Sequence, residues 1–347
     1  MKTQQTGPAY RDSRAVARVG RADRGTVLVV VLWVLVALSL LALSFSVAVR
    51  TEVNASRNTV DQKRSYYFAR AGIEYAIYKV LESQSAFFQS QQQLEGQIGQ
   101  QPVGPLNFVN LQLADGGADV EIIDETGKIN LNLAPPHLIY NLLITIGVQP
   151  GDADIITDSI EDWRDPDDLN RANGAESEYY QSLNPPYFAK NGPFDVPEEL
   201  LLVRGVTPEI YYGKKALSDT GERIEYYGLQ NYLTTFSSIA RININAAPAA
   251  VLAAIPGLDY DVANQIVAMR QQEPLMDIGQ VMERIPGIPT EAANYLSAMR
   301  SQVYTLVSSG KLHNSEVISR VRAVVRMQNA GPQLYTVLYW NESNLEM

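Results

Sequence analysis

The chain contains no cysteine and only two histidines, His137 and His313. The absence of cysteine excludes disulfide bonds, thiolate metal sites and cysteine nucleophiles. Two histidines that lie far apart in the sequence make a zinc site or a histidine-centred catalytic triad hard to assemble. A protein that works outside the cytoplasm without disulfides needs another kind of stabilisation, and bound cations are one option.

Negative charge predominates, but it is spread unevenly along the chain. The formal charge is −10 over 347 residues, yet the first 25 residues carry a net charge of +4. The remainder therefore carries about −14. An acidic body repels phosphate backbones, so we expect no nucleic-acid partner. The length, together with an apolar fraction of 46%, is sufficient for two or three packed units.

An uncharged apolar run follows the basic leader directly and extends from Thr26 to Val49. As a helix it would be about 36 Å long, enough to cross a hydrocarbon core of about 30 Å. The alternative is a cleaved secretory signal, for which the end of the run, SFSVAVRTEV, could supply a cleavage site. The apolar core of such a signal is only about 7–15 residues long, however. The sequence therefore predicts a retained anchor, and its N-terminus should be cytoplasmic because basic residues precede it.

The helical pattern continues beyond the anchor through residues 50–93. The stretch from residue 50 to residue 88 has no proline and one glycine. Apolar residues recur at helical spacing in one stripe, made of Val49, Val53, Val60, Tyr67, Ala71 and Tyr75 or Tyr78. We interpret the tyrosines as core residues that pack against the following domain. The prediction is a helix of about 55–60 residues, half in lipid and half amphipathic.

This arrangement resembles the prepilins of the type IV pilin class: a short basic leader ends in glycine and is followed at once by such a helix. The resemblance implies that residues 1–25 are a leader peptide and that a prepilin peptidase cuts between Gly25 and Thr26. Most pilins have glutamate at the fifth mature position, where this chain has Val30. Within the class, the member without this carboxylate is the K-type minor pseudopilin of type II secretion, which resides at the pseudopilus tip. Thr26, which would be the first mature residue, is less apolar than the residue usual at that position. This departure bears on N-methylation of the mature N-terminus more than on cleavage.

Strand-like segments lie on both sides of a long helical region. Residues 83–105, rich in glutamine and glycine, are typical of a helix end that becomes a linker. In residues 105–133, alternating apolar residues flank Glu125-Thr126-Gly127, which predicts a hairpin. Residues 301–347 are β-rich, with a last turn at Asn329-Ala330-Gly331-Pro332. We therefore expect an α+β protein. With the resemblance, it is a type IV pilin-like fold, a long N-terminal helix packed on an antiparallel sheet that a helical insertion domain at residues 134–300 interrupts.

The insertion contains an internal repeat. GKINLNLAPPHLIYNLL at residues 127–143 matches ARININAAPAAVLAAI at residues 240–255. Asn132 and Asn245 stand where an N-cap would be, with proline just inside each expected helix. Each copy continues with an apolar turn and a helix that ends at Gly205 or Gly287.

The second copy, at residues 240–300, resembles a helix-hairpin-helix unit. DNA-binding versions present backbone N–H groups to phosphate from a Gly-x-Gly hairpin. The hairpins here read Pro256-Gly257-Leu258-Asp259 and Pro286-Gly287-Ile288-Pro289, so aspartate or proline replaces the second glycine. Aspartate repels phosphate and proline has no N–H to donate. We therefore interpret the unit as a packing module, and keep a membrane-tethered DNA receptor as the alternative function.

The segment 161–195, which we call the acidic loop, is the most distinctive part of the body. Its first half carries seven carboxylates, Glu161, Asp162, Asp165, Asp167, Asp168, Glu176 and Glu178, against Arg164 and Arg171. Tyrosines at positions 179, 180 and 187 would supply a small core. One interpretation is a solvated charge run that aids solubility. The other is a calcium site, because Ca²⁺ takes six to eight oxygen ligands at short spacing.

Three of these residues have the spacing of an EF-hand, since Asp165, Asp167 and Glu176 fall at loop positions 1, 3 and 12. The loop is not an EF-hand, because Asn170 stands where glycine is required. K-type pseudopilins carry calcium in the helical domain, so the resemblance favours the metal. We predict Asp165, Asp168 and Glu176 as ligands, with Asp167 and Asp195 as further members. The carboxylates could instead form an acid–base pair, as in a glycosidase, but the residues give no support for this. A metal-dependent hydrolase is a third alternative, for which the sequence gives no nucleophile or base beyond the loop acids.

The sequence therefore predicts a structural and assembly protein rather than an enzyme. By resemblance it is anchored once in the bacterial inner membrane with its body in the periplasm. The expected partners are the I- and J-type minor pseudopilins, with which it would initiate the pseudopilus. Prepilin peptidase and other inner-membrane components of type II secretion are also expected partners.

Overall fold

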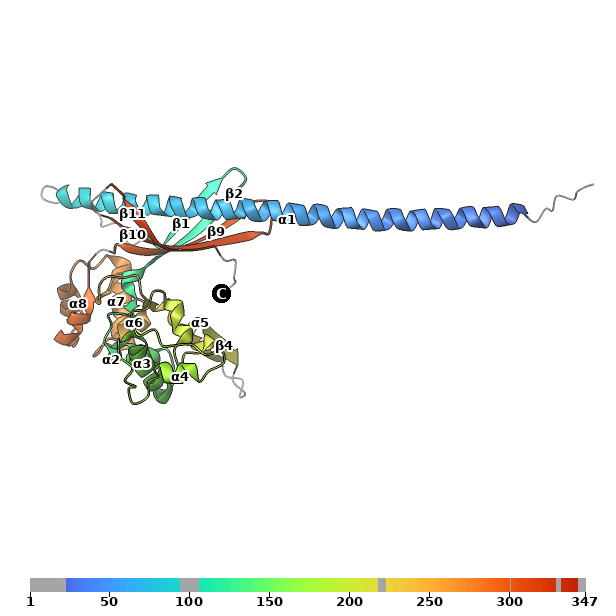
Figure 1. Cartoon of the computed structure of the whole chain (residues 1–347). Helices are drawn as coiled ribbons and strands as arrows, with labels where there is room; N and C mark the ends of the chain where they lie inside the picture. The colour runs from blue at the N-terminus through green and yellow to red at the C-terminus, as the bar shows by residue number, and fades with distance from the viewer. Residues whose placement is uncertain (1–22, 94–105, 218–222, 300, 329–331, 343–347) are drawn as a thin grey trace, which may run out of the picture. The chain divides into compact units, whose positions relative to one another are not determined.

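A computed structural model describes residues 23–93, 106–217, 223–299, 301–328 and 332–342 (Figure 1). The chain divides into two compact units, Met1–Val60 and Asp61–Met347. Helix α1 (Asp23–Gln93) begins in the first unit and ends in the second, and it is longer than the expected 55–60 residues. The turn expected at Asn329-Ala330-Gly331-Pro332 lies largely outside the described residues.

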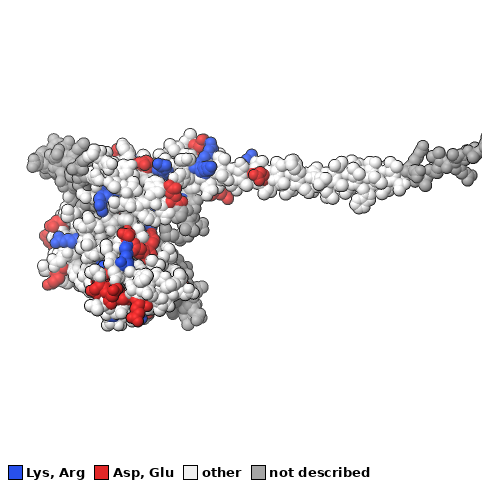
Figure 2. Space-filling model, in the orientation of Figure 1, with Lys and Arg blue, Asp and Glu red and all other residues white. Residues whose placement is uncertain are grey.

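In the first unit the structure describes α1 from Asp23 to Val60, which contains the apolar run. Its most apolar window of 18 residues has a mean hydropathy of 2.9, and no part of that window is buried within the chain. Figure 2 shows a long stretch of this helix, between its charged side chains and the grey end, without Lys, Arg, Asp or Glu. It is the one helix of the described residues that is long and apolar enough to cross a membrane. The helix therefore fits the predicted anchor.

The second unit contains a five-stranded antiparallel sheet in the order β1-β2-β9-β10-β11. Its strands are β1 (Phe108–Leu113), β2 (Gly116–Asp124), β9 (Val303–Leu312), β10 (Ile318–Met327) and β11 (Tyr335–Asn341). The central pairing joins β2 to β9, with Val120 opposite Ser308. Two strands that are neighbours in the sheet are thus separated by the whole inserted domain. This confirms the predicted sheet with its insertion.

The second half of α1 packs on this sheet through a narrow face. Its buried residues are Ser65, Ala69, Gly72, Ile73, Ala76, Ile77 and Val80. Gly72 and Gly310 let the backbones approach closely, because a Cβ on Gly310 would collide with the Ser65 carbonyl and one on Gly72 would lie 2.5 Å from Ser308 Oγ. Small residues therefore set the distance between helix and sheet.

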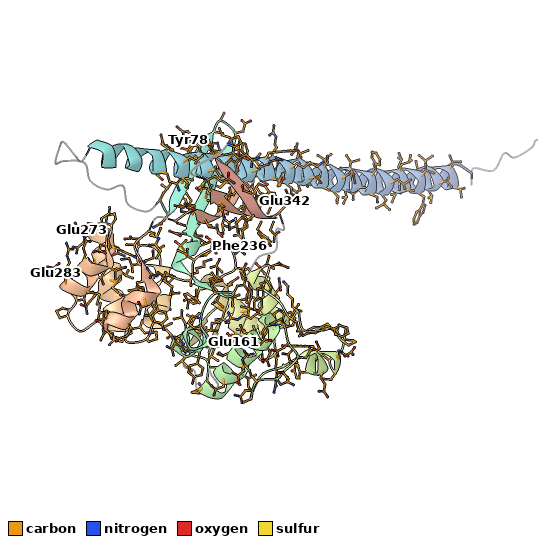
Figure 3. All side chains as sticks on the ribbon, turned by 60° about the vertical axis from the view of Figure 1, so that its left-hand side comes forward. Tyr78, Glu161, Phe236, Glu273, Glu283 and Glu342 are labelled. Carbon is orange, nitrogen blue, oxygen red and sulfur yellow. The ribbon has the colours of Figure 1, made fainter. Side chains whose placement is uncertain are left out.

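The predicted apolar stripe of α1 was wrong at most of its positions, although Tyr75 is partly buried against the core of the sheet. Tyr67 and Tyr78 are 64% and 56% exposed, and Val60 is also exposed. The stripe selected large apolar residues at helical spacing, but the close contact with the sheet requires alanine and glycine. The side chains of Tyr67 and Tyr78 lie on faces of α1 that the sheet leaves open, as Figure 3 shows for Tyr78.

The hairpin predicted around Glu125-Thr126-Gly127 was also wrong. These residues form a single 3₁₀ turn, η1, after which the chain leaves the sheet. Strand β2 instead forms a hairpin with β1. Glu125 is buried at this exit, where its Oε1 lies 2.7 Å from Lys128 Nζ and accepts a hydrogen bond from Thr305 Oγ1 at 2.7 Å. Burial alone would raise the pKa of Glu125, but the charge of Lys128 and these hydrogen bonds hold it below its usual value.

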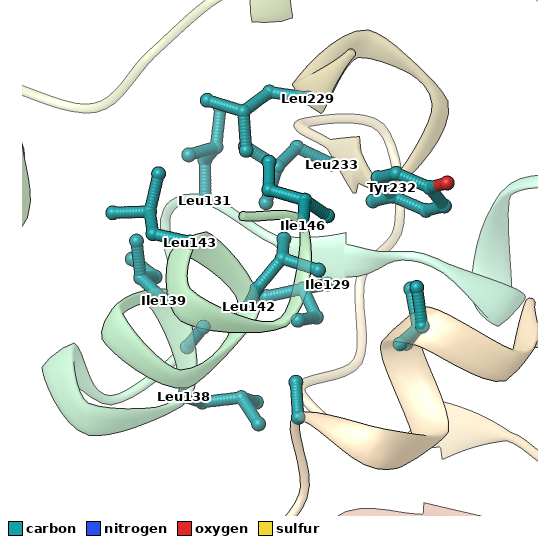
Figure 4. Close-up of a cluster of buried hydrophobic side chains, with 14 of the residues drawn as sticks. Ile129, Leu131, Leu138, Ile139, Leu142, Leu143, Ile146, Leu229, Tyr232 and Leu233 are labelled. Atoms are coloured by element: carbon teal, nitrogen blue, oxygen red, sulfur yellow. The ribbon is translucent and has the colours of Figure 1, made fainter. Parts of the chain in front are cut away.

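The inserted domain is mostly helical and has its own core. Its first part holds β3 (Ile129–Asn130), α2 (Pro136–Thr145), α3 (Pro150–Arg164), α4 (Ser177–Gln181), η2 (Pro197–Leu202), α5 (Pro208–Tyr212), β4 (Gly213–Leu217), β5 (Arg223–Tyr227), η3 (Leu229–Asn231) and β6 (Leu233–Thr234). Its second part holds β7 (Ile242–Asn243), α6 (Ala249–Ala253), α7 (Tyr260–Gln272), α8 (Ile278–Arg284), η4 (Thr290–Tyr295) and β8 (Leu296–Ser297). One hydrophobic cluster runs through both parts, and Figure 4 shows its portion around α2.

The internal repeat is visible in the hydrogen bonds of the two parts. Short parallel pairs close each copy, β3 with β6 and β7 with β8. Arg164 at the end of α3 donates to the carbonyls of residues 131 and 134, and Arg270 near the end of α7 donates to those of residues 244 and 247. Gly147 and Gly257 adopt positive φ in the equivalent turns between paired helices. The two copies therefore share the same pattern of strand pairing, hydrogen bonds and turns. Their relation to helix-hairpin-helix units stays a prediction.

Asn132 and Asn245 are not the predicted N-caps. The cap positions are Pro135 and Pro248, and neither makes a side-chain cap hydrogen bond. Each asparagine instead bridges to a distant segment. Asn132 bonds the carbonyl and N–H of Phe194 at 2.9 and 2.8 Å, and Asn245 bonds those of Leu275 at 2.8 Å each. Each side-chain amide can both donate and accept, so it pairs with the carbonyl and the N–H of one distant residue at once and links the two segments.

Candidate metal site in the acidic loop

The acidic loop begins later than its composition predicts. Glu161 and Asp162 belong to α3, which ends at Arg164, and the N–H of Asp165 closes the helix on the Glu161 carbonyl at 3.0 Å. Arg164 also pairs with Glu161 while it reaches back to the start of the domain. The first loop residues are therefore fixed to a rigid helix end. Figure 2 shows acidic side chains gathered over this part of the inserted domain.

A cluster of aromatic rings forms a small core within and beside the acidic loop. Trp163 is 3% exposed, and its ring centroid lies 5.3 Å from that of Tyr180 and 6.4 Å from that of Phe194. These residues come from α3, from α4 and from the end of the loop. Of the tyrosines expected in this core, Tyr180 is fully buried, Tyr187 is half-buried, and Tyr179 lies exposed at the rim.

Asparagine side chains hold the loop backbone. Asn191, at φ 48°, donates to the Asp167 carbonyl at 3.1 Å and to Asp168 Oδ1 at 2.9 Å. Asn170 Oδ1 accepts from the N–H of Glu176 at 2.9 Å. The loop is therefore folded, as the sequence indicates, and it brings residues on both sides of Asn170 together.

Three carboxylates converge in this folded loop. One oxygen each from Asp165, Asp167 and Glu176 can be chosen so that all three lie within 4.8 Å of one another. Calcium binds oxygen at 2.3–2.6 Å, so ligands on opposite sides of an ion are about 4.6–5.2 Å apart. The spacing of the three oxygens fits one cation between them.

The buried Glu176 is the strongest indication of a ligand. It is 2% exposed, and neither of its carboxylate oxygens has a hydrogen-bond partner. Asp165 Oδ1 and Asn191 Oδ1 are likewise buried without a partner. Burial, followed by the charges of Asp162 and the other loop carboxylates, raises the pKa of Glu176 to about 7. Orphaned acceptors in an environment this negative suit a hard divalent cation.

The remaining predicted ligands lie at different distances from this centre. Asp168 belongs to the same loop but accepts from Asn191. The Asp195 carboxylate is 83% exposed and pairs with Lys190 at 2.8 Å, outside the group of three. Our sequence reasoning did not single out Asp162, which is fully buried, or its partner Arg171. The available signal was the helical spacing of Asp162 and Asp165 on either side of Trp163.

The other sequence-based candidates lie elsewhere. Gly25 and Thr26 are in the first turn of α1, and Val30 is an exposed residue of the same helix. Asp259 caps α7 by accepting from the N–H of Val262 at 2.8 Å. The Pro289 ring lies against Gly257, so the two hairpins of the second copy pack on each other. Both replacements therefore have structural roles.

Known proteins similar to this chain include several members of one family. Two family models, both described as "Type II secretion system (T2SS), protein K", match residues 106–213 and 242–298. A putative type II secretion system protein K of Escherichia coli K12 is 27% identical over 203 residues, which are 54% of this chain and 60% of that protein. The protein K of Pseudomonas aeruginosa is 25% identical over 270 residues, 73% of this chain and 74% of that one. The match thus spans less than two thirds of the length of the E. coli relative and more than two thirds of the length of the Pseudomonas relative.

A solved structure has the same fold. The crystal structure of the GspK-GspI-GspJ complex from the type 2 secretion system of enterotoxigenic E. coli contains a chain that matches with a TM-score of 0.53. The match has 18% sequence identity and covers 79% of this chain and 99% of the other. None of these similarities supports the DNA-receptor alternative. The pilin-like fold, the two family matches and the protein K relatives agree with the resemblance drawn from the leader and anchor, and the chain belongs to the type II secretion system protein K family.

Proposed function

We propose that this chain is the minor pseudopilin at the tip of the type II secretion pseudopilus, where it initiates assembly for protein export across the outer membrane. The observation that carries the proposal is Val30 in an anchor without a single charged residue from Thr26 to Val49. A glutamate in lipid needs a partner from the next subunit, and a subunit at the tip has none above it. A valine at this position therefore suits an end of the filament and not its shaft.

The partners we propose are the I- and J-type minor pseudopilins. The similar solved chain forms a complex with GspI and GspJ. In this chain, Tyr67 and Tyr78 on α1 are exposed, and their rings lie beside Tyr66 and Tyr75 respectively. Exposed aromatic residues on a long helix are suited to packing against the helices of neighbouring subunits.

The location we propose is the bacterial inner membrane, crossed once, with the body in the periplasm. Prepilin peptidase would cut between Gly25 and Thr26, so that the basic leader is removed and the apolar helix becomes the mature N-terminus. The six basic residues of the leader support a cytoplasmic N-terminus. Assembly would also bring the chain into contact with other inner-membrane components of the secretion system. The role is mechanical, and we assign the clustered carboxylates to metal binding rather than to catalysis.

Calcium is the cofactor we propose for the acidic loop. Asp165, Asp167 and Glu176 would hold it, with Asp168 and Asn191 close by. The cation would supply the positive charge that buried carboxylates otherwise lack, and so fix the loop. The melting temperature of the full chain in detergent tests this, with calcium, with magnesium and with chelator. At 100 times the dissociation constant, calcium stabilises a folded protein by about 2.7 kcal/mol, and an unchanged midpoint would refute the site.

Co-purification tests the assembly role. The full chain and its I- and J-type partners would be expressed together, extracted in detergent and isolated through a tag on this chain. We expect a stable complex with one copy of each. Tyr67→Ala/Tyr78→Ala should release the partners, whereas Phe188→Ala, which removes an aromatic side chain that is 69% exposed on the inserted domain, should not. If neither partner is retained by the wild-type chain, the proposal is wrong.

A further inference from the structure

Arg171 pairs with two carboxylates of the acidic loop, although a cation is an unexpected neighbour for a calcium site. Its Nη1 donates to Asp162 Oδ1 at 2.7 Å and to Asp165 Oδ2 at 2.6 Å. Its backbone N–H also points to the Asp162 carboxylate, at 3.2–3.3 Å from the two oxygens. Among the residues that the structure describes, it is the one cation that forms an ion pair with either carboxylate.

The two oxygens of Asp165 have different surroundings. Oδ2 is bound by Arg171, while Oδ1 is buried without a hydrogen-bond partner. A free carboxylate could turn and offer both oxygens to a cation, or neither. The bond from Arg171 fixes the orientation in which Oδ1 alone is left for a metal.

Asp162 differs from Asp165 because both of its carboxylate oxygens are occupied. It is fully buried, and the side chain and backbone of Arg171 occupy its oxygens. Gly174 lies against Oδ2, where any larger residue would collide with it. Asp162 thus contributes negative charge near the centre but has no oxygen directed to a metal, because Arg171 takes it up.

We propose that Arg171 is the positioning residue of the calcium site: it presents Asp165 to the cation through Oδ1 alone and keeps Asp162 out of the coordination shell. This inference rests on the proposed calcium site. It goes beyond that site because it assigns the ligand geometry to a residue that touches no metal. Interactions of this kind behind metal ligands typically change metal affinity by about 10- to 100-fold when they are removed.

The effect of removing Arg171 on calcium affinity distinguishes positioning of Asp165 from simple electrostatics. Removing a positive charge beside a cation should strengthen calcium binding if charge alone matters. If Arg171 positions Asp165, Arg171→Gln should instead weaken calcium binding by about 10- to 100-fold. Arg171→Lys keeps the charge and can still donate to both carboxylates, so it should recover most of the affinity.

The test uses the full chain in detergent. Calcium affinity would be measured by titration calorimetry for the wild type, Arg171→Gln and Arg171→Lys. Lys190→Gln is the matched control, because it removes one positive charge from the same loop, where Lys190 pairs with Asp195 and Glu199 and not with Asp162 or Asp165. Terbium in place of calcium, excited through the buried Trp163 and Tyr180, reports the number of water molecules on the ion from its luminescence lifetime in H₂O and D₂O.

Weaker binding by Arg171→Gln, with a changed water number, unchanged Lys190→Gln and rescue by lysine, supports the proposal. Equal or tighter calcium binding by Arg171→Gln overturns it, and charge is then the whole effect. Weaker binding with the same number of coordinated waters also overturns it, because Arg171 would then only keep the loop folded. A wild-type chain that binds no calcium refutes the calcium site itself, which separates that failure from failure of the role of Arg171.

Discussion

Glu176→Gln should have opposite effects on the chain with and without calcium. Glu176 is 2% exposed, both its oxygens lack partners, and its pKa is raised to about 7. Raising the pKa of a carboxyl from about 4.5 to about 7 makes its ionised form about 3 kcal/mol less favourable in the folded state. Glutamine has the same shape without the charge. Because its amide also finds few partners, we expect a gain of about 1–2 kcal/mol in the metal-free protein at pH 8.

The pH dependence of this gain has a definite sign. A raised folded pKa means that Glu176 contributes stability below about pH 4.5 and that this contribution is lost as the pH rises through about 7. The free energy of unfolding of metal-free Glu176→Gln, minus that of the metal-free wild type, should therefore increase between pH 4.5 and pH 8. With saturating calcium the order reverses, because the wild type gains the metal and the variant has lost a ligand.

The assay is thermal or urea unfolding of the full chain in detergent, in chelator and in calcium, at several pH values. Glu178→Gln is the control, since Glu178 lies exposed two residues further along the same segment. It should follow the wild type in every condition. The reasoning fails if Glu176→Gln is less stable than the wild type in chelator at pH 8, or if calcium stabilises both proteins equally.

Three further predictions concern the framework around the site, and unfolding measurements test each. Gly310→Ala should destabilise the chain by about 2–3 kcal/mol, since its Cβ would collide with the backbone of α1, while Gly151→Ala, with open space around it, should be neutral or slightly stabilising. Asn132→Ala and Asn245→Ala should each lose about 2–3 kcal/mol and do so alike, because each leaves two buried backbone groups unpaired; markedly unequal losses would contradict the equivalence of the two copies. Lys128→Met should lose about 3–5 kcal/mol by leaving Glu125 buried without its cation, and a second change, Glu125→Gln, should recover part of that loss. Recovery in the double variant separates the lost charge partner from lost packing.

The parts of the fold that were predictable carry their signal locally. The uncharged run from Thr26 to Val49 and the β-rich C-terminus correspond to α1 and to β9, β10 and β11. The pairing of β2 with β9 was not predictable in the same way, because β9 follows β2 in the chain only after the whole inserted domain. Glu125, which lies where the chain leaves the sheet, likewise accepts a hydrogen bond from Thr305 of that distant strand.

The candidate site was partly predictable because its ligands are close in sequence. The EF-hand-like spacing of Asp165, Asp167 and Glu176 pointed to the three residues that converge, although the predicted ligands placed Asp168 ahead of Asp167. The role proposed for Arg171 could not be foreseen, because one of two arginines in an acidic run looks like ordinary charge balance. The faces of α1 were misjudged for a related reason: large apolar residues dominate a sequence pattern, while Gly72 and Gly310 decide how closely the helix and the sheet approach.

The pairing of β2 with β9 has a consequence for the order in which the chain becomes structured. When β2 leaves the ribosome, its partner is still about 180 residues away, and one edge of the strand stays open. Closing a loop of that length would cost about 4–5 kcal/mol in chain entropy if the intervening residues were unfolded. The inserted domain has its own core, and the residues that flank it, Asp124 and Tyr304, are paired in the sheet. Once it has formed during synthesis it shortens the effective gap to a few residues, so that the last strands of the chain complete the sheet as a nearly local event.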